Sequence, residues 1–205
     1  NESSDRKNIK QTIQSFQHSF RGNTNEKRIA LILKINGPKL NTKNFISVSE
    51  YIKEINNEVK SPHPVYLLYG NYTNDQLNAL YNHPKIKCYL SLSHGEGFGR
   101  PILEATLNNL PIIAPNWSGH LDLIPNDSDL LVSGSIKKVP DDIPHTTSNS
   151  SWFYPEINSA ITCIERVKSE YSQYHAQAKQ IANDNLEKYN KDTMFEKYTH
   201  ILKEY

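Results

Sequence analysis

The stretch IKCYLSLSHGEGFGRPILEATLNNLPIIAP, residues 86–115, contains the pattern that decides the fold. It opens with a mostly apolar run, Ile86–Leu92, which is typical of a buried strand. A glycine-rich loop, Ser93–Pro101, follows, and Ile102–Asn108 has the character of a short helix. Ile112–Ala114 is again an apolar strand segment. Strand, glycine loop, helix and strand in this order predict one unit of a parallel sheet.

The same alternation of strands and helices extends toward the N-terminus and a little beyond residue 115. Further strands are predicted at Ile29–Ile35, Pro64–Gly70 and Leu130–Val132. The first two are continuous apolar runs suited to burial on both faces. Helices are predicted from Ile9 to Phe20 with Gly22 closing the helix, from Phe45 to Val59, and from Asp75 to Tyr81 behind Thr73 or Asn74 as the capping residue. Strands and helices that alternate five times indicate an α/β fold, in which helices cover both faces of a parallel sheet.

Beyond Val132 the alternation stops. Ser133–Ser151 is polar, contains two prolines and has no periodicity, so we expect a surface loop there. The rest of the chain is predicted to be helical, at Ile157–Glu170, Tyr174–Tyr189 and Phe195–Leu202, the last behind Asp192 or Thr193 as the cap. We therefore interpret residues 1–205 as a single Rossmann-like domain with a helical C-terminal tail.

Composition restricts the classes of partner. Lys and Arg total 23 and Asp and Glu total 22, which gives a formal charge of +1 and no reason to expect nucleic acid or an anionic membrane as the main partner. No apolar run approaches the roughly 20 residues needed for a transmembrane segment, and the chain opens with a polar stretch rather than a signal peptide. Cys88 and Cys163 are isolated, so we expect reduced thiols and a cytoplasmic location.

The glycine loop has the features of an anion site. Ligands of open parallel sheets bind beyond the carboxyl ends of the strands, where this loop lies. Gly95, Gly97 and Gly99 allow the backbone to approach a ligand closely, and Pro101 suits the first helical position. The N-terminus of the following helix has free N–H groups and a partial positive charge, which favour a phosphate.

Two carboxylates flank the predicted phosphate position. Glu96 lies in the loop and Glu104 follows eight residues later in the helix. A carboxylate does not hold a phosphate, but it accepts hydrogen bonds well from the paired hydroxyls of a sugar. Taken alone, Glu104 would be read as a helix residue that complements the helix dipole. Together, the loop, the two carboxylates and the flanking strands indicate a nucleotide-sugar diphosphate as the ligand.

This stretch resembles the Glu-x7-Glu signature of retaining glycosyltransferases with the GT-B architecture, specifically family four, also called group 1. Three other segments resemble the same family in order and spacing. Residues 4–8 (SDRKN) are similar to its arginine-lysine segment for donor phosphates, residues 68–81 (LYGNYTNDQLNALY) to the elements around its base, and residues 152–155 (WFYP) to the step before its final helices. The resemblance covers essentially the whole chain and implies the carboxyl-terminal, donor-binding half of such an enzyme.

The resemblance implies a role for each matching residue. Glu96 would contact hydroxyls of the donor sugar and Glu104 those of the ribose. Lys7, with Arg6 beside it, would bind the diphosphate, so that Glu96, Lys7 and Arg6 form the catalytic group. Backbone groups of the loop would face the sugar and the diphosphate, at Gly95, Gly97, Phe98, Gly99 and Arg100.

At several positions more than one interpretation stays open. The family often has a second arginine where this chain has Asn1, and Lys34 at the end of a strand is either its substitute or an ordinary solvated lysine. The Arg100 side chain either reaches a phosphate or an acidic sugar, or points to solvent. Tyr72, after Gly70, is a candidate to cover the nucleobase. His94 either hydrogen-bonds the donor or fixes the loop.

Neither a metal nor a cofactor is predicted. Asp127-Ser128-Asp129 imitates the Asp-x-Asp metal motif of a different glycosyltransferase fold, but it lies in the segment PNDSD, where aspartates favour turns. The family does not need such a metal. The expected ligand is a donor substrate such as a UDP- or GDP-sugar.

The function implied is the donor-binding part of a retaining, metal-independent hexosyltransferase for glycan biosynthesis. The acceptor-binding N-terminal domain, which we expect to be absent from this chain, would be supplied in cis or by a partner chain. A nucleotide-sugar binding module without turnover of its own is an alternative. An epimerase-like or phosphorylase-like enzyme of the same fold is another, although no further catalytic groups for it can be identified.

Overall fold

Two groups of parallel strands lie at the centre of the protein in the computed structural model, which describes residues 5–22, 29–35, 42–59, 62–139, 143 and 149–203. The first group pairs β1 (Leu31–Ile35) with β2 (Val65–Tyr69), and the second has the order β3 (Tyr89–Leu90), β4 (Ile112–Pro115), β5 (Leu131–Val132). One apolar cluster joins them, because Leu31 and Val65 pack against the same buried core as Leu92 and Ile113.

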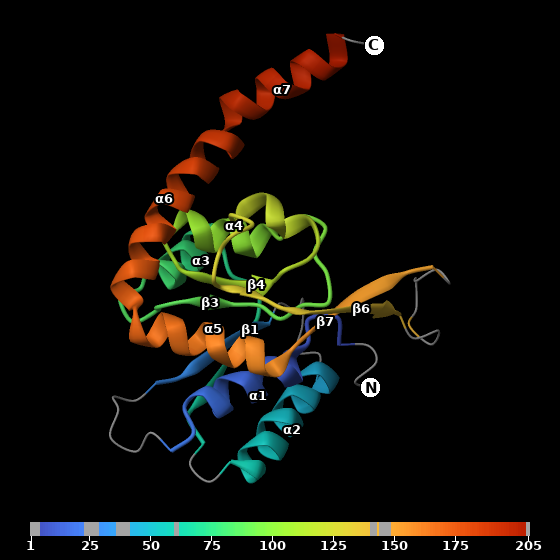
Figure 1. The fold of residues 1–205 in the computed structure, drawn as a ribbon, viewed down its shortest axis with the longest axis vertical. Helices are drawn as coiled ribbons and strands as arrows, with labels where there is room; N and C mark the ends of the chain where they lie inside the picture. The colour runs from blue at the N-terminus through green and yellow to red at the C-terminus, as the bar shows by residue number, and fades with distance from the viewer. Residues whose placement is uncertain are drawn as a thin grey trace.

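Helices cover both faces of these strands, as Figure 1 shows. On one face lie α1 (Ile9–Ser19), α2 (Thr42–Glu58) and α5 (Ile157–Ser169); on the other lie α3 (Asn74–Tyr81), α4 (Arg100–Leu107) and the short 3₁₀ helix η2 (Gly119–Leu123). α6 (Tyr171–Tyr189) packs against α4, and α7 (Lys191–Lys203) continues away from the domain. The predicted Rossmann-like α/β fold with a helical tail is confirmed.

The strands have similar apolar sequences but differ in how deeply their side chains are buried. β4 is buried along its whole length, as an apolar central strand should be. β1 and β2 were predicted to be buried on both faces as well, but their side chains are mostly half-buried and Tyr66 is exposed. Within the described residues β1 and β2 pair only with each other, so each has one unpaired side, and a strand without a second partner remains partly accessible to water.

The predicted surface loop at Ser133–Ser151 is wrong in part. Residues 134–138 form a strand, β6 (Gly134–Lys138), which pairs antiparallel with β7 (Ser151–Pro155), and Figure 1 shows this hairpin projecting from the domain. The side chains of β6 beyond Gly134 are exposed, so the segment has no apolar alternation from which a strand could be predicted. Backbone pairing with β7 forms the strand instead.

The helix caps differ in how well local sequence predicts them. Thr73 caps α3 as predicted, in a capping box with Gln76. The cap predicted for the last helix is wrong: α7 begins at Lys191, so that Asp192 and Thr193 lie inside it. The Oδ1 atom of Asn190 accepts a hydrogen bond from the backbone N–H of Thr193 at 2.9 Å and takes the capping role.

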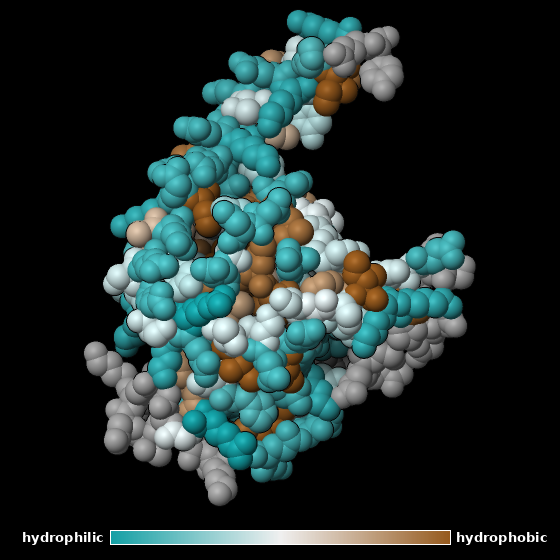
Figure 2. Space-filling model, viewed as in Figure 1, coloured by the Kyte–Doolittle hydropathy of each residue, from teal (hydrophilic) through white to brown (hydrophobic). Residues whose placement is uncertain are grey.

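The last helix carries apolar side chains on an otherwise hydrophilic arm (Figure 2). Phe195, Tyr198, Ile201 and Leu202 are all at least half exposed. Within the described residues, no helix combines the length and the apolar character needed to cross a membrane.

The shared core should carry much of the stability. Leu92 is fully buried where the two strand groups meet, so Leu92→Ala should lower the free energy of unfolding by about 2–5 kcal/mol through lost burial and the resulting cavity. Leu202→Ala is the control, because Leu202 is 76% exposed and should change stability by less than about 0.5 kcal/mol. Urea denaturation measures both. Equal effects of the two substitutions would contradict this description of the core.

Candidate donor-binding site

The glycine loop runs from the end of β3 to the start of α4. Gly99 has a φ of +82°, and a Cβ at this residue would lie 2.9 Å from the Cβ of His120. Glycine is therefore required at position 99 both for the backbone conformation and for the close approach. α4 begins at Arg100, so Pro101 occupies the second helical position rather than the predicted first one. Its missing N–H is harmless there as well, because the first-turn donors have no partner within the helix.

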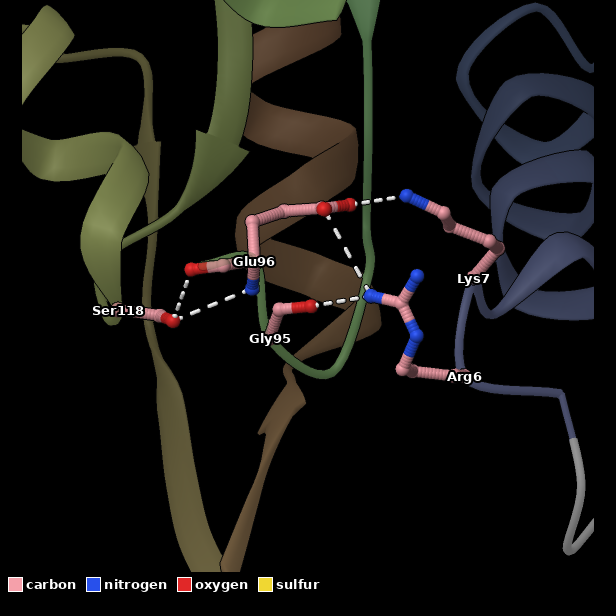
Figure 3. A network of polar contacts seen from close by, with 5 residues as sticks. All are labelled: Arg6, Lys7, Gly95, Glu96 and Ser118. Atoms are coloured by element: carbon pink, nitrogen blue, oxygen red, sulfur yellow. Dashed lines mark hydrogen bonds and ion pairs between the residues drawn. The ribbon is translucent and has the colours of Figure 1, made fainter. Parts of the chain in front are cut away.

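A second turn, after β4, holds the loop in place. The Oγ of Ser118 accepts a hydrogen bond from the backbone N–H of Glu96 at 3.1 Å and donates to the backbone oxygen of Glu96 at 2.7 Å (Figure 3). The backbone N–H of Gly119 donates to the same oxygen at 3.0 Å. Ser118 and Gly119 are site residues that our sequence reasoning missed. Their place directly after a central strand was the available signal, by the rule that located the glycine loop.

The segment at Arg6 and Lys7 crosses to the other side of the loop, although it is 89 residues away in sequence. Nη1 of Arg6 donates to the backbone oxygen of Gly95 at 2.6 Å and lies 3.6 Å from Oε2 of Glu96. Nζ of Lys7 donates to Oε1 of the same carboxylate (Figure 3). The backbone N–H of His94 also donates to the backbone oxygen of Arg6. The three predicted catalytic residues therefore lie in one cluster.

The anion of the cluster is mostly buried, whereas its two cations are about half exposed. The Glu96 side chain is 12% exposed, whereas the side chains of Lys7 and Arg6 are 48% and 49% exposed. Burial alone would raise the pKa of Glu96. The hydrogen bond and charge of Lys7 and the charge of Arg6 outweigh burial and hold that pKa below its ordinary value. Glu96 is therefore ionised at neutral pH, and the three side chains together carry one net positive charge.

Of the two interpretations of His94, the contacts favour the one that fixes the loop. Nδ1 of His94 donates to the backbone oxygen of Phe153 at 2.6 Å, and the backbone N–H of Phe153 donates to the oxygen of His94 at 3.0 Å. The ring is stacked on Trp152, with centroids 4.8 Å apart, and contacts Tyr154. Strand β7 thereby supports the glycine loop from a third direction.

His120 lies fully buried next to Gly99 of the loop. It was not identified as a residue of the site from the sequence. Its Nε2 atom donates to the backbone oxygen of Pro115 at 2.8 Å, because a carbonyl can only accept. Its Nδ1 atom has no hydrogen-bond partner among the described residues. Burial lowers the pKa of His120, although the Pro115 carbonyl and the charge of Glu96 act in the opposite direction. A neutral imidazole therefore fills the space below Gly99.

Glu104 belongs to a separate cluster, on the side of α4 that faces α3. Its Oε1 accepts a hydrogen bond from Nε of Arg100 at 2.9 Å, so the Arg100 side chain, which is 73% exposed, pairs with Glu104 on the surface of α4 rather than with the cluster around Lys7. A hollow of about 340 Å³ opens between the two helices. Most of its lining residues have polar side chains: Asn74, Asp75, Leu77, Asn78, Tyr81, Arg100, Glu104, Leu107 and Asn108. Burial, with the charge of Glu104, raises the pKa of Tyr81 to about 12, so this phenol stays protonated.

Lys34, Gly70 and Tyr72 form a third cluster at the carboxyl ends of β1 and β2. Nζ of Lys34 donates to the backbone oxygen of Gly70 at 2.6 Å and lies 4.5 Å from the centre of the Tyr72 ring. Partial burial lowers the pKa of Lys34. Lys34 is thus engaged by the chain itself rather than being an ordinary solvated lysine. Asn1, the position that suggested a substitute, lies outside the described residues.

Two other predicted positions are more open. Phe98 is partly exposed and meets the ring of Tyr189 edge-on at 5.3 Å, and a Cβ at Gly97 would meet nothing within 4 Å. Asp127 and Asp129 lie in the predicted turn, where the backbone oxygen of Asp129 accepts a hydrogen bond from Arg166. Within the part of the chain that the structure describes, no three His, Cys, Asp or Glu side chains are grouped to hold a metal ion.

Comparison with protein families identifies the family to which the chain belongs. The family described as glycosyl transferases group 1 matches residues 2–143, which is more than half of the chain. The chain belongs to this family. The match includes the Arg6–Lys7 segment, the glycine loop and both carboxylates. No curated protein matches the sequence at a significant level.

Solved structures show the same fold. The Anabaena protein Alr3699/HepE, crystallised with UDP and glucose, superposes with a TM-score of 0.68 at 14% identity over 98% of this chain and 46% of its own. The pneumococcal O-GlcNAc transferase GtfA, crystallised with UDP and GlcNAc, gives 0.56 at 16% identity over 98% of this chain and 34% of its own. The chain therefore spans less than half the length of either neighbour. The predicted carboxyl-terminal GT-B domain of a group 1 glycosyltransferase is confirmed.

The contact between the glycine loop and the turn after β4 can be tested without a ligand. A Cβ at Gly119 would lie 1.9 Å from the backbone oxygen of Gly97, so Gly119→Ala must push the two segments apart. We expect a loss of stability of about 1–3 kcal/mol. Gly97→Ala has open space and should change stability by less than about 1 kcal/mol. Thermal and urea denaturation compare the two variants, and equal stabilities would refute this close approach.

Proposed function

We propose that this chain binds the nucleoside-diphosphate sugar donor of a group 1 glycosyltransferase, with the glycine loop and the Arg6–Lys7 segment around the diphosphate. One observation carries the proposal: two half-exposed cations meet a mostly buried carboxylate beside a glycine loop and the N-terminus of α4. A diphosphate would be held by the charges of Lys7 and Arg6 and by backbone N–H groups at the start of the helix.

We assign the two carboxylates to the two sugar units of the donor. Glu96 lies beside the proposed diphosphate position, so we assign it to the hydroxyls of the transferred sugar. Glu104 faces the hollow between α3 and α4, which has room for a nucleoside, so we assign it to the ribose hydroxyls. Tyr72 and Lys34 remain candidates for the base and for the second phosphate charge. The UDP in both structural neighbours supports UDP-sugars as the first donors to test.

The proposed chemistry is transfer of a hexose with retention and without a metal. No carboxylate of the cluster is assigned as a nucleophile. The contribution of these residues would be to position the donor and to stabilise the charge of the departing diphosphate, through Lys7, Arg6 and the helix terminus. Transfer also needs an acceptor-binding domain, which we propose is supplied in the same polypeptide or by a partner chain.

Lys7 provides the direct test. A thermal-shift screen of UDP- and GDP-sugars in buffer with EDTA identifies the donor, because a ligand that binds only the native state raises the melting temperature. Lys7→Ala should then weaken the nucleoside diphosphate by about 1.5–3 kcal/mol, as expected for a lost charge-assisted hydrogen bond. Lys10→Ala is the matched control, because the Lys10 ammonium pairs with Glu54 on α2 at 3.2 Å. Calorimetry that shows equal affinity in both variants would exclude Lys7 from the site.

The EDTA in this screen also tests metal independence. Binding lost in EDTA and restored by manganese would refute it.

Glu104 tests the assignment of the nucleoside. Glu104→Ala should weaken UDP and UDP-glucose by the same amount, about 1–3 kcal/mol, because both ligands contain the ribose. Inorganic pyrophosphate has no ribose and should bind the variant no more weakly than it binds the wild type. Calorimetry with the three ligands, after circular dichroism has confirmed folding, makes the comparison. A loss of pyrophosphate affinity would place Glu104 in support of the loop rather than at the ribose.

A further inference from the structure

The two cations proposed for the donor phosphates already have an anionic partner. The Lys7 ammonium donates to Oε1 of Glu96, and Nη1 of Arg6 lies 3.6 Å from Oε2. The carboxylate is the least accessible member of the three, and its backbone is fastened on both sides by Ser118. The backbone of Glu96 is therefore held beside the two cations. Any phosphate that binds Lys7 meets the negative charge of this side chain.

A phosphate and a carboxylate compete for one lysine ammonium even when both can hydrogen-bond to it. The ammonium has three N–H donors, but the two anions repel each other at this range and share one positive charge. Because the pKa of Glu96 is held below its ordinary value, the carboxylate stays charged at neutral pH. A diphosphate thus binds either beside a repelling carboxylate or after the Lys7–Glu96 contact has weakened. Both alternatives reduce its affinity.

A sugar attached to the diphosphate changes this balance. Its hydroxyls are paired donors next to the phosphate, and a carboxylate that has lost its lysine accepts them well. A free nucleoside diphosphate has no such hydroxyls at this end. It therefore offers the mostly buried carboxylate no hydrogen bond in place of the one from Lys7. The same side chain therefore opposes one ligand and favours the other.

We propose that Glu96 discriminates the nucleotide sugar from the free nucleoside diphosphate by acting as the resident counter-ion of Lys7 and Arg6. This inference rests on the proposed function and adds a selectivity to it. Before a ligand binds, the Glu96 carboxylate pairs with Lys7 and Arg6. With the nucleotide sugar bound, the sugar hydroxyls replace the lysine at the carboxylate. When only the nucleoside diphosphate remains, Glu96 returns to Lys7 and promotes its release.

Glu96→Gln tests the inference, because glutamine keeps the size and the hydrogen-bonding capacity of glutamate and removes only the charge. Isothermal calorimetry should compare inorganic pyrophosphate, UDP with UDP-glucose, and GDP with GDP-mannose. Pyrophosphate and the nucleoside diphosphate should bind the variant about twofold to fivefold more tightly than the wild type, the range for breaking a partly exposed ion pair. The nucleotide sugar should gain nothing or weaken, so the preference for it over the diphosphate should fall.

Two further variants complete the experiment. Glu54→Gln breaks the Lys10–Glu54 ion pair and makes the same change in net charge, so it should leave all these affinities unchanged. Glu96→Asp keeps the charge but shortens the side chain, so pyrophosphate should bind it no more tightly than it binds Glu96→Gln. Circular dichroism and thermal melts check that each variant is folded.

The outcomes separate this inference from the proposed function. If wild type binds a nucleotide sugar but Glu96→Gln binds pyrophosphate and nucleoside diphosphate no more tightly, the counter-ion role is wrong and the donor site stands. If wild type binds pyrophosphate but no nucleotide or nucleotide sugar, the proposed function is wrong, and the pyrophosphate comparison still decides whether Glu96 opposes an anion. An equal gain in Glu54→Gln would show a general effect of net charge and overturn the inference.

Discussion

The site depends on the close approach between the backbone of Glu96–Gly97 and the turn at Ser118–Gly119. This approach leaves no room for a Cβ at Gly119, and two hydrogen bonds to the Glu96 oxygen accompany it. The contact joins the loop after β3 to the turn after β4, and the two strands pair directly in the sheet. Once these segments are joined, the backbone of Glu96 is held within reach of Lys7 and Arg6. The two cations then determine its charge state.

The ion pairs that the site residues form with one another affect how any ligand binds. A mostly buried carboxylate with two more accessible cations leaves one net positive charge, so an incoming anion is attracted to the cluster but competes with Glu96 for Lys7 and Arg6. Affinity then depends on what the ligand offers the displaced carboxylate. Glu104 stands in a similar relation to Arg100 at the neighbouring hollow. Both acidic positions of the family signature are therefore paired with cations of this chain.

Local sequence determined much of this protein. The alternation of apolar runs predicted the parallel strands and the helices on both faces, because burial imposes a period on the sequence. Thr73 and Gln76 predicted the start of α3, since a capping box uses only residues within one turn. The glycine at position 99 was predictable for the same reason: a strand-to-helix turn needs a backbone conformation that glycine adopts without strain. The family signature then indicated which residues to place at the site.

Tertiary structure alone decided the contacts between distant segments. Lys7 and Glu96 are 89 residues apart, so their pairing follows from where α1 lies against the sheet and not from any spacing. β6 has exposed side chains and forms a strand only because the backbone of β7 lies beside it. The buried histidine below Gly99 likewise depends on the approach of two loops. Sequence patterns record local periods and local conformations, whereas the pairing of charges and backbones across the sheet is determined only when the chain is folded.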